Sequence, residues 1–261
     1  MKRLSLYDGG LRDFLRFRFQ LSMDLLIVLI SFLILVAGLY TVMKTVPIDS
    51  VWVPISMFIL GISVPIAYNS LVKNRPLSET GISKKYWLRS LVLGLVLSAI
   101  VLIAPHSSSS PITFIAAVKA LTFTELLPLL ALEITAGLFW VIFFCGWVQM
   151  RFERAFGAMP AILVAAAFFA IHHVAYGEPI SLLYMGHFMG GLIHATIFRI
   201  TRNILIVWPF FIATTGLIYD LGWGLRLPFE TIYGYIGVLV LMWLFIAVVH
   251  WKQKKRESSI S

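Results

Sequence analysis

Charged residues are scarce in this chain, and their scarcity sets its class. Only 13% of its 261 residues are Asp, Glu, Lys or Arg, whereas water-soluble domains carry about 25%. Hydrophobic residues make up 60% of the chain, and its mean hydropathy is +0.92. A water-soluble domain of this length cannot hide so much apolar surface. The composition therefore excludes that class and predicts an integral membrane protein.

Cysteine and acidic residues are also rare. The single cysteine, Cys145, excludes an internal disulfide and any cysteine-rich metal site. Twelve acidic residues against 21 basic ones give a net charge of +9. A basic chain can bind nucleic acid when its cations form one face of a soluble surface. Here the cations form short clusters between apolar runs, as in membrane proteins, so no nucleic-acid partner is expected.

Long apolar runs are what the chain has instead. A run of roughly 17–25 apolar residues can cross a bilayer as a helix. Eight such runs predict an all-α, polytopic transmembrane helical bundle of about eight spans, surrounded by the lipid bilayer. Gly177-Glu178-Pro179, between the fifth and sixth runs, predicts a tight turn. The predicted spans are residues 22–43, 51–72, 88–105, 126–150, 160–177, 179–200, 203–220 and 231–250.

The basic residues follow the positive-inside rule for eight spans. With the N-terminus in the cytoplasm, 18 of the 21 basic residues fall on cytoplasmic segments, the exceptions being Lys44, Lys119 and Arg226. Both termini are therefore predicted to be cytoplasmic, in a multi-pass protein of a cell membrane such as a bacterial plasma membrane. The predicted parts are a cytoplasmic or interfacial segment (1–20, an amphipathic helix or a simple flank of the first span), a single transmembrane domain (21–250) and a basic cytoplasmic tail (251–261).

Six ionisable residues fall in or beside the predicted spans. Such residues are costly in a bilayer, by about 2.5–3.5 kcal/mol or more at its centre, and often mark function. They lie on three consecutive spans and can converge on a water or a divalent metal ion, although no cofactor is required by the pattern. Alternatively, each makes a hydrogen bond to a neighbouring helix. They are Glu125, Glu133, His172, His173, His187 and His194.

Three stretches between about 120 and 220 carry a resemblance to a known family. They read FFCGWVQMRFERAFGAMPAIL (143–163), FFAIHHVAYG (168–177) and GLIHATIFRITRNIL (191–205). This region resembles the CPBP family of CAAX-protease and bacteriocin-processing membrane proteins. The family's motifs are Glu-Glu-x-x-x-Arg, Phe-x-x-x-His and His-x-x-x-Asn or Asp. The resemblance implies a fold of about eight helices and an intramembrane endopeptidase in which a glutamate activates water.

The chain departs from two of these three motifs. The Glu-Glu pair falls on Trp140 and Val141, and the motif arginine falls on Cys145. The second motif is kept as Phe169-x-x-x-His173. The third falls on Phe211 and Thr215. Trp and Val offer no lone pair to take a proton from water, and general-base catalysis typically contributes about 10²–10⁴-fold in rate.

These observations leave three functional hypotheses. The first is a catalytically degenerate member that binds a membrane-embedded peptide or protein helix. The second is an active endopeptidase whose site is rebuilt around Glu133 with His173, His187 and His194 as further catalytic candidates. The third is a small transporter, which fits the intramembrane ionisable residues but lacks a pair of broken half-helices in corresponding positions. Cys145 is expected to be a packed structural residue.

Overall fold

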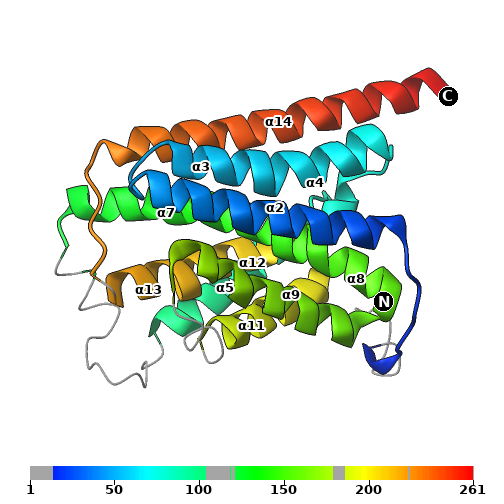
Figure 1. The fold of residues 1–261 in the computed structure, drawn as a ribbon, viewed down its shortest axis with the longest axis horizontal. Helices are drawn as coiled ribbons and strands as arrows, with labels where there is room; N and C mark the ends of the chain where they lie inside the picture. Colours follow the sequence, from blue (N-terminus) through cyan, green and yellow to red (C-terminus); the bar gives the residue numbers. More distant parts are fainter. Residues whose placement is uncertain (1–13, 104–117, 119–120, 179–185, 223, 261) are drawn as a thin grey trace.

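The computed structural model describes residues 14–103, 118, 121–178, 186–222 and 224–260, and over these residues the protein is helical, with no strand (Figure 1). The all-α prediction is confirmed. The main helical elements are α2 (Met23–Thr45), α3 (Trp52–Ser56), η1 (Met57–Ser63), α4 (Val64–Ala67), η2 (Tyr68–Val72), η3 (Leu77–Thr80), α5 (Trp87–Ile103), α7 (Phe123–Trp140), η4 (Val141–Gln149), α8 (Met150–Phe156), α9 (Ala158–His172), η5 (His173–Tyr176), α11 (Phe188–Thr201), α12 (Ile204–Phe211), η7 (Ile212–Gly216), α13 (Leu217–Gly222) and α14 (Thr231–Ile260).

Five helices in the described part of the chain are long and apolar enough to cross a membrane. They are Met23–Thr45, Trp52–Val72, Phe123–Phe156, Ala158–Tyr176 and Thr231–Arg256. The other three predicted spans contain shorter helices. α5 and α11 have 17 and 14 residues. The run 203–220 becomes α12, η7 and α13 in succession.

The predicted terminal segments are described only in part. Residues 1–13 lie outside the described residues, and residues 16–22 have no regular secondary structure. The backbone N–H groups of Arg18 and Gln20 donate to the carbonyl oxygens of Phe156 and Ala155, so the segment 16–22 lies along the end of α8. At the other end, α14 continues without a break through the predicted tail to Ile260.

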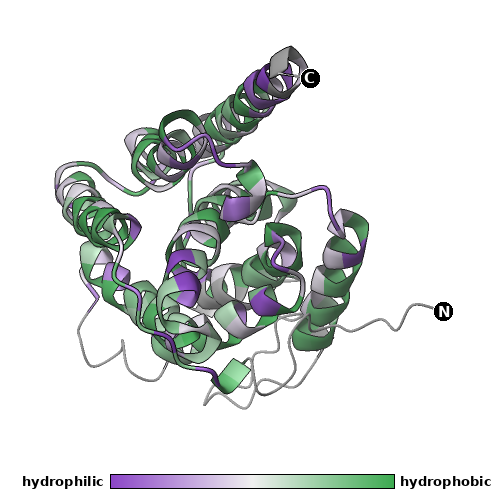
Figure 2. Cartoon of the chain, turned by 90° about the vertical axis from the view of Figure 1, so that its right-hand side faces the viewer, coloured by the Kyte–Doolittle hydropathy of each residue, from purple (hydrophilic) through white to green (hydrophobic). Residues whose placement is uncertain are grey.

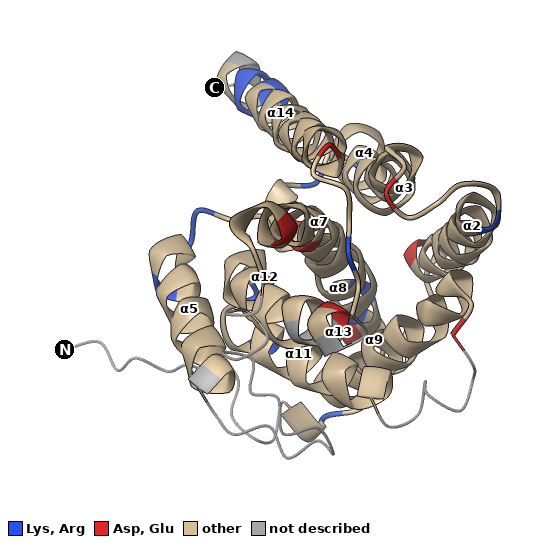
Figure 3. Cartoon of the chain, turned by 90° about the vertical axis from the view of Figure 1, so that its left-hand side faces the viewer, with Lys and Arg blue, Asp and Glu red and all other residues tan. Residues whose placement is uncertain are grey.

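A continuous helical rod made of α7, η4 and α8 runs through the middle of the bundle. Between Leu126 and Val148, only Glu133 and Thr135 are charged or hydroxyl-bearing. A helix that is apolar on all sides is expected in the interior. Within its apolar 18-residue window 78% of the rod is buried, against 28% for the corresponding window of α14 and 33% for that of α2. Viewed end-on, α7 and α8 lie inside a ring that includes α14, α4, α2, α9, α11, α12 and α5 (Figure 3).

A buried arginine ties helix ends together at the end of the bundle where α8 lies. The Arg151 guanidinium donates to Glu79 O at 2.6 Å and to Asn69 Oδ1 at 2.5 Å, and it lies 4.1 Å from the Trp147 ring centre. Such partners lower the cost of burying a cation, although Nε of Arg151 has no hydrogen-bond partner among the described residues. Further ion pairs at this end are Arg75–Asp24, Arg154–Glu79, Arg199–Glu153 and Arg202–Glu153. Figure 2 looks onto this end, where hydrophilic segments interrupt the mainly hydrophobic helices.

Gly146 lets Thr80, the last residue of η3, come close to the central rod. A Cβ added to Gly146 would lie 2.1 Å from the Thr80 carbonyl oxygen, a contact with backbone that no side-chain rotation relieves. Glycine is therefore needed here for close approach. The same contact holds η3 against η4 and places Glu79 O within reach of Arg151.

We predict that Gly146→Ala destabilises the protein by about 1–3 kcal/mol, the usual cost of forcing an extra methyl group into a filled interior. Unfolding in detergent, followed by circular dichroism, measures this. Gly237→Ala on α14 is the matched control, because its added Cβ meets nothing within 4 Å. That variant should be neutral or slightly stabilised. Equal stability of the two variants would contradict the packing argument.

Candidate functional site

Aromatic rings fill the position where the resemblance places the water-activating glutamate. Trp140 is 5% exposed, and its ring centre lies 3.5 Å from that of Phe169, 4.2 Å from Phe144 and 5.0 Å from Phe211. Thus two positions that replace motif residues, Trp140 and Phe211, are packed against each other. The cluster offers apolar faces where a hydrolase would need a lone pair beside a water molecule.

Phe169 is the centre around which the four predicted histidines gather. Ring centres of His173, His172, His187 and His194 lie 5.0, 5.4, 6.0 and 6.2 Å from that of Phe169. The four histidines of the neighbouring helices thus lie around one phenyl ring. They do not form one polar centre, because the Phe169 ring lies among them and only His173 and His187 share a polar partner.

His173 and His187 share one carboxylate, that of Glu178. His173 Nδ1 is 3.0 Å from Glu178 Oε1, and His187 Nε2 is 2.5 Å from Glu178 Oε2. The two imidazole rings are stacked, with centres 3.5 Å apart and an interplanar angle of 15°. We call His173, Glu178 and His187 the His–Glu–His cluster. The ligand atoms of these three residues, one oxygen and two nitrogens, lie close enough together to hold a metal ion.

The local backbone explains how this cluster forms. His173 opens η5, the last turn of the α9 rod, and Gly177 follows it with φ +82°. This left-handed conformation, which favours glycine, reverses the chain and places Glu178 next to His173. His187 immediately precedes α11. Burial raises the pKa of Glu178, but hydrogen bonds from His173 and His187 outweigh it and hold the pKa well below its usual range.

His172 and His194 have other partners. His172 Nδ1 is 2.5 Å from Phe169 O, and its ring lies 4.9 Å from that of Trp140, on the aromatic side. His194 Nε2 is 3.1 Å from Thr214 Oγ1, which joins α11 to η7. The His194 contact is of the helix-to-helix kind that the sequence left open as the alternative, whereas the His172 contact stays within α9.

Glu133 is buried in the central rod, and the carboxyl group it meets is that of Asp220. The two side chains are hydrogen-bonded. Two carboxyl groups in such contact need a proton between them. Gly216 makes room for Glu133, because a Cβ there would lie 1.6 Å from Glu133 Oε2. The carboxylate that joins His173 and His187 is therefore Glu178, whereas the sequence pointed to Glu133.

Glu178 and Asp220 are the site residues that sequence reasoning missed. Glu178 was assigned to a turn because it lies between Gly177 and Pro179. One feature of the sequence could have identified Glu178: it is a carboxylate in a very short connection between two apolar runs that both carry histidines.

Glu125, by contrast, caps α7. Its carboxylate accepts hydrogen bonds at 2.8 Å from the Thr122 N–H and from the Thr122 hydroxyl.

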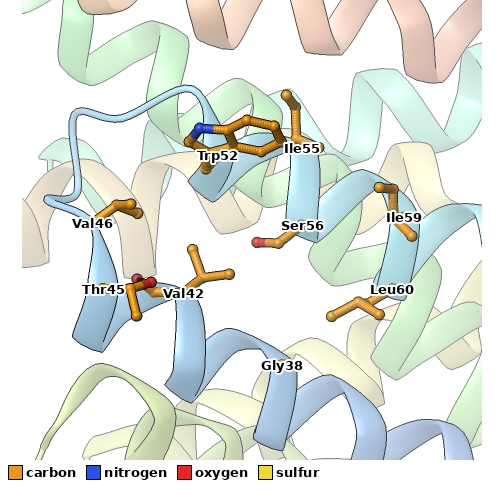
Figure 4. A pocket seen from close by; sticks show the side chains of 9 residues that line it. All are labelled: Gly38, Val42, Thr45, Val46, Trp52, Ile55, Ser56, Ile59 and Leu60. Atoms are coloured by element: carbon orange, nitrogen blue, oxygen red, sulfur yellow. Dashed lines mark hydrogen bonds between the residues drawn. The ribbon is translucent and has the colours of Figure 1, made fainter.

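An apolar groove lies between α2 and the α3–η1 helix (Figure 4). Its volume is about 470 Å³. Figure 4 shows the Ser56 hydroxyl pointing into the space between the two helices. α2 also packs against η5, the turn that carries His173. The lining residues are Gly38, Val42, Thr45, Val46, Trp52, Ile55, Ser56, Ile59 and Leu60.

We predict that Trp140→Ala destabilises the protein by about 3–5 kcal/mol, because the indole packs against three aromatic side chains and its loss leaves a cavity. Equilibrium unfolding in detergent measures the change. Trp251→Ala is the matched control, since that indole is 61% exposed, and its effect should stay within about 0.5 kcal/mol. A Trp140→Ala variant as stable as the control would show that the ring cluster is not packed as described.

Searches of protein-family profiles, curated proteins and solved structures found no match to this chain.

Proposed function

We propose that this protein is a catalytically degenerate relative of the CPBP intramembrane endopeptidases that binds a membrane-embedded peptide or protein helix. The observation that carries the proposal is the packing of Trp140 against Phe169 and Phe211, at the positions where the resemblance expects the catalytic glutamate and a motif histidine. Indole and phenyl rings cannot take a proton from water or hold an oxyanion. Peptide hydrolysis by the family chemistry is therefore absent at this position.

The proposed topology has eight spans with both termini in the cytoplasm of a bacterial plasma membrane. This topology is supported by contacts that bring the predicted cytoplasmic segments together at one end of the bundle. Arg75, in the second to third connection, pairs with Asp24 at the start of α2, and its carbonyl oxygen accepts from Gln253 near the end of α14. Arg202 pairs with Glu153 at the same end. Lysines and arginines gathered at one end of a bundle favour the cytoplasmic side.

Single-cysteine labelling tests this topology. Lys255→Cys on α14 and Arg226→Cys before it are both at exposed positions, and the buried native Cys145 is replaced by Ser. A membrane-impermeant maleimide should label position 226 in intact spheroplasts and position 255 only in inverted vesicles. Labelling of both positions from the same side would exclude the proposed topology.

The groove between α2 and the α3–η1 helix is the proposed binding surface. Its lining is apolar apart from Thr45 and Ser56, as suits a ligand that lies in hydrocarbon. At Gly38 the two walls meet, because a Cβ there would lie 2.5 Å from Leu60 Cδ1. Ile59 is 50% exposed beside the groove, so a partner helix can reach it from the lipid.

Photo-crosslinking tests binding and catalysis in the same experiment. A benzophenone amino acid at Ile59 should capture a membrane peptide or protein in native membranes. The matched control is Val240 on α14, which is equally exposed at 51%. Mass spectrometry of the captured partner should show it uncleaved, and unchanged by His173→Ala or Glu133→Gln. Equal capture at both positions would exclude the groove, and cleavage lost in these variants would exclude degeneracy.

An active endopeptidase is the second candidate, and one observation favours it. The His–Glu–His cluster contains a carboxylate and two imidazoles in contact, which is a set able to activate water. In this case the rebuilt site would use Glu178 in place of Glu133. Cleavage of the captured partner that is lost in Glu178→Gln but kept in Glu133→Gln would establish this alternative.

A further inference from the structure

The His–Glu–His cluster contains nitrogen and oxygen atoms of the kinds that bind metal ions, and it holds these atoms close together. The exposed fractions of the three side chains are 11% for His173, 15% for Glu178 and 5% for His187. One ligand atom from each lies within 4.8 Å of the other two. The donors come from two helical elements, η5 and the start of α11, and the reversal at Gly177 positions the third.

The geometry of the cluster matches a tetrahedral metal site after a small expansion. Metal–ligand bonds of about 2.0–2.1 Å at tetrahedral angles put neighbouring ligand atoms about 3.3 Å apart. In the cluster, one ligand atom from each residue lies within 4.8 Å of the other two, and His173 and His187 contact different oxygens of Glu178, at 3.0 and 2.5 Å. Ligand atoms this close can reach the tetrahedral spacing by side-chain rotation. The stacked rings, 3.5 Å apart, already direct a nitrogen of each to the same carboxylate.

His173 also needs a strong partner on this side of its ring. Its Nε2 is buried and has no hydrogen-bond partner among the described residues. The polar contact of this imidazole is therefore made through Nδ1, the atom that faces Glu178, while packing against His187 and Phe169 also holds the ring. A metal ion bonds to an imidazole nitrogen more strongly than a single carboxylate oxygen does, so it would stabilise the ring where it lies.

The ligand types select the kind of ion. Imidazole suits Zn²⁺, Fe²⁺, Ni²⁺ and Cu²⁺, whereas Mg²⁺ and Ca²⁺ prefer oxygen ligands alone. Two histidines and one glutamate leave the fourth tetrahedral position for water, as in zinc sites with three protein ligands. We propose that His173, Glu178 and His187 bind one divalent transition-metal ion of the Zn²⁺ class. The ion would join the end of the α9–η5 helix to the start of α11.

This proposal does not depend on the proposed function. A metal ion there would serve a non-catalytic protein as a clamp between two helices, and it would serve a hydrolase by binding the reactive water. Its test must therefore measure metal binding itself and not peptide cleavage.

Metal titration of the purified full chain in nanodiscs provides that test. Protein stripped with a chelator is titrated with Zn²⁺, and with Co²⁺ as a spectroscopic probe, and bound metal is counted by mass spectrometry. We expect one ion per chain and the intense d–d absorption of a four-coordinate Co²⁺ site. Glu178→Gln and His187→Asn should each lose more than the roughly 10–100-fold in affinity that removal of an outer-shell partner costs.

His250→Ala is the matched control, because His250 is an exposed histidine on α14, away from the cluster. It should bind metal as the wild type does. Glu178→Asp keeps a carboxylate and should recover part of the lost affinity, which a purely structural defect in Glu178→Gln would not predict. X-ray absorption of the wild-type Zn²⁺ complex supplies a second measurement if a variant fails to fold, and it should show two imidazole ligands. A folded wild type that binds neither ion, or binding unchanged in Glu178→Gln and His187→Asn, would overturn the proposal.

Discussion

Lipid offers no hydrogen-bond partners, so every polar group that enters the bilayer core has to find its partner inside the protein. The arrangement of the central rod follows from this constraint. Thr135 reaches the Tyr235 carbonyl on α14, Trp147 reaches Ser31 on α2, and Gln149 reaches the Ala195 carbonyl on α11. Each of these contacts ties one outer helix to the rod. Polar residues placed at intervals along one apolar helix thus determine which neighbours pack around it.

The same constraint explains the grouping of ionisable side chains into closed sets. Glu133 meets Asp220, Arg151 meets two oxygen acceptors, and Glu178 meets two histidines. Each side chain of these sets has at least one polar partner, which lowers the cost of its burial. The His–Glu–His cluster differs from the others in composition, because it combines nitrogen and oxygen donors that also serve as metal ligands. Of these sets, it is the one whose donor atoms suit a metal ion.

Sequence reasoning reached the helical class and the convergence of the histidines because both depend on local patterns. Long apolar runs predict helices, and histidines on neighbouring runs predict proximity. The identity of the carboxylate was not reachable in this way. Glu133 is the obvious acidic residue of the fourth run, but only the tertiary path of α13 brings Asp220 to it. Glu178 enters the site through the positive φ of Gly177, a backbone detail that a turn prediction does not resolve.

The unbroken course of α14 has a mechanical consequence. At 1.5 Å per residue, its 30 residues make a rod about 45 Å long, whereas the hydrocarbon core is about 30 Å thick. One end must therefore stand well clear of the hydrocarbon, and the last turns carry Lys252, Lys254, Lys255 and Arg256. Gln253 donates to the Arg75 carbonyl and Arg256 to Asn74 Oδ1, so this end of α14 is tied to the connection between η2 and η3. That connection thus fixes where the cations of the last turns lie relative to the rest of the bundle.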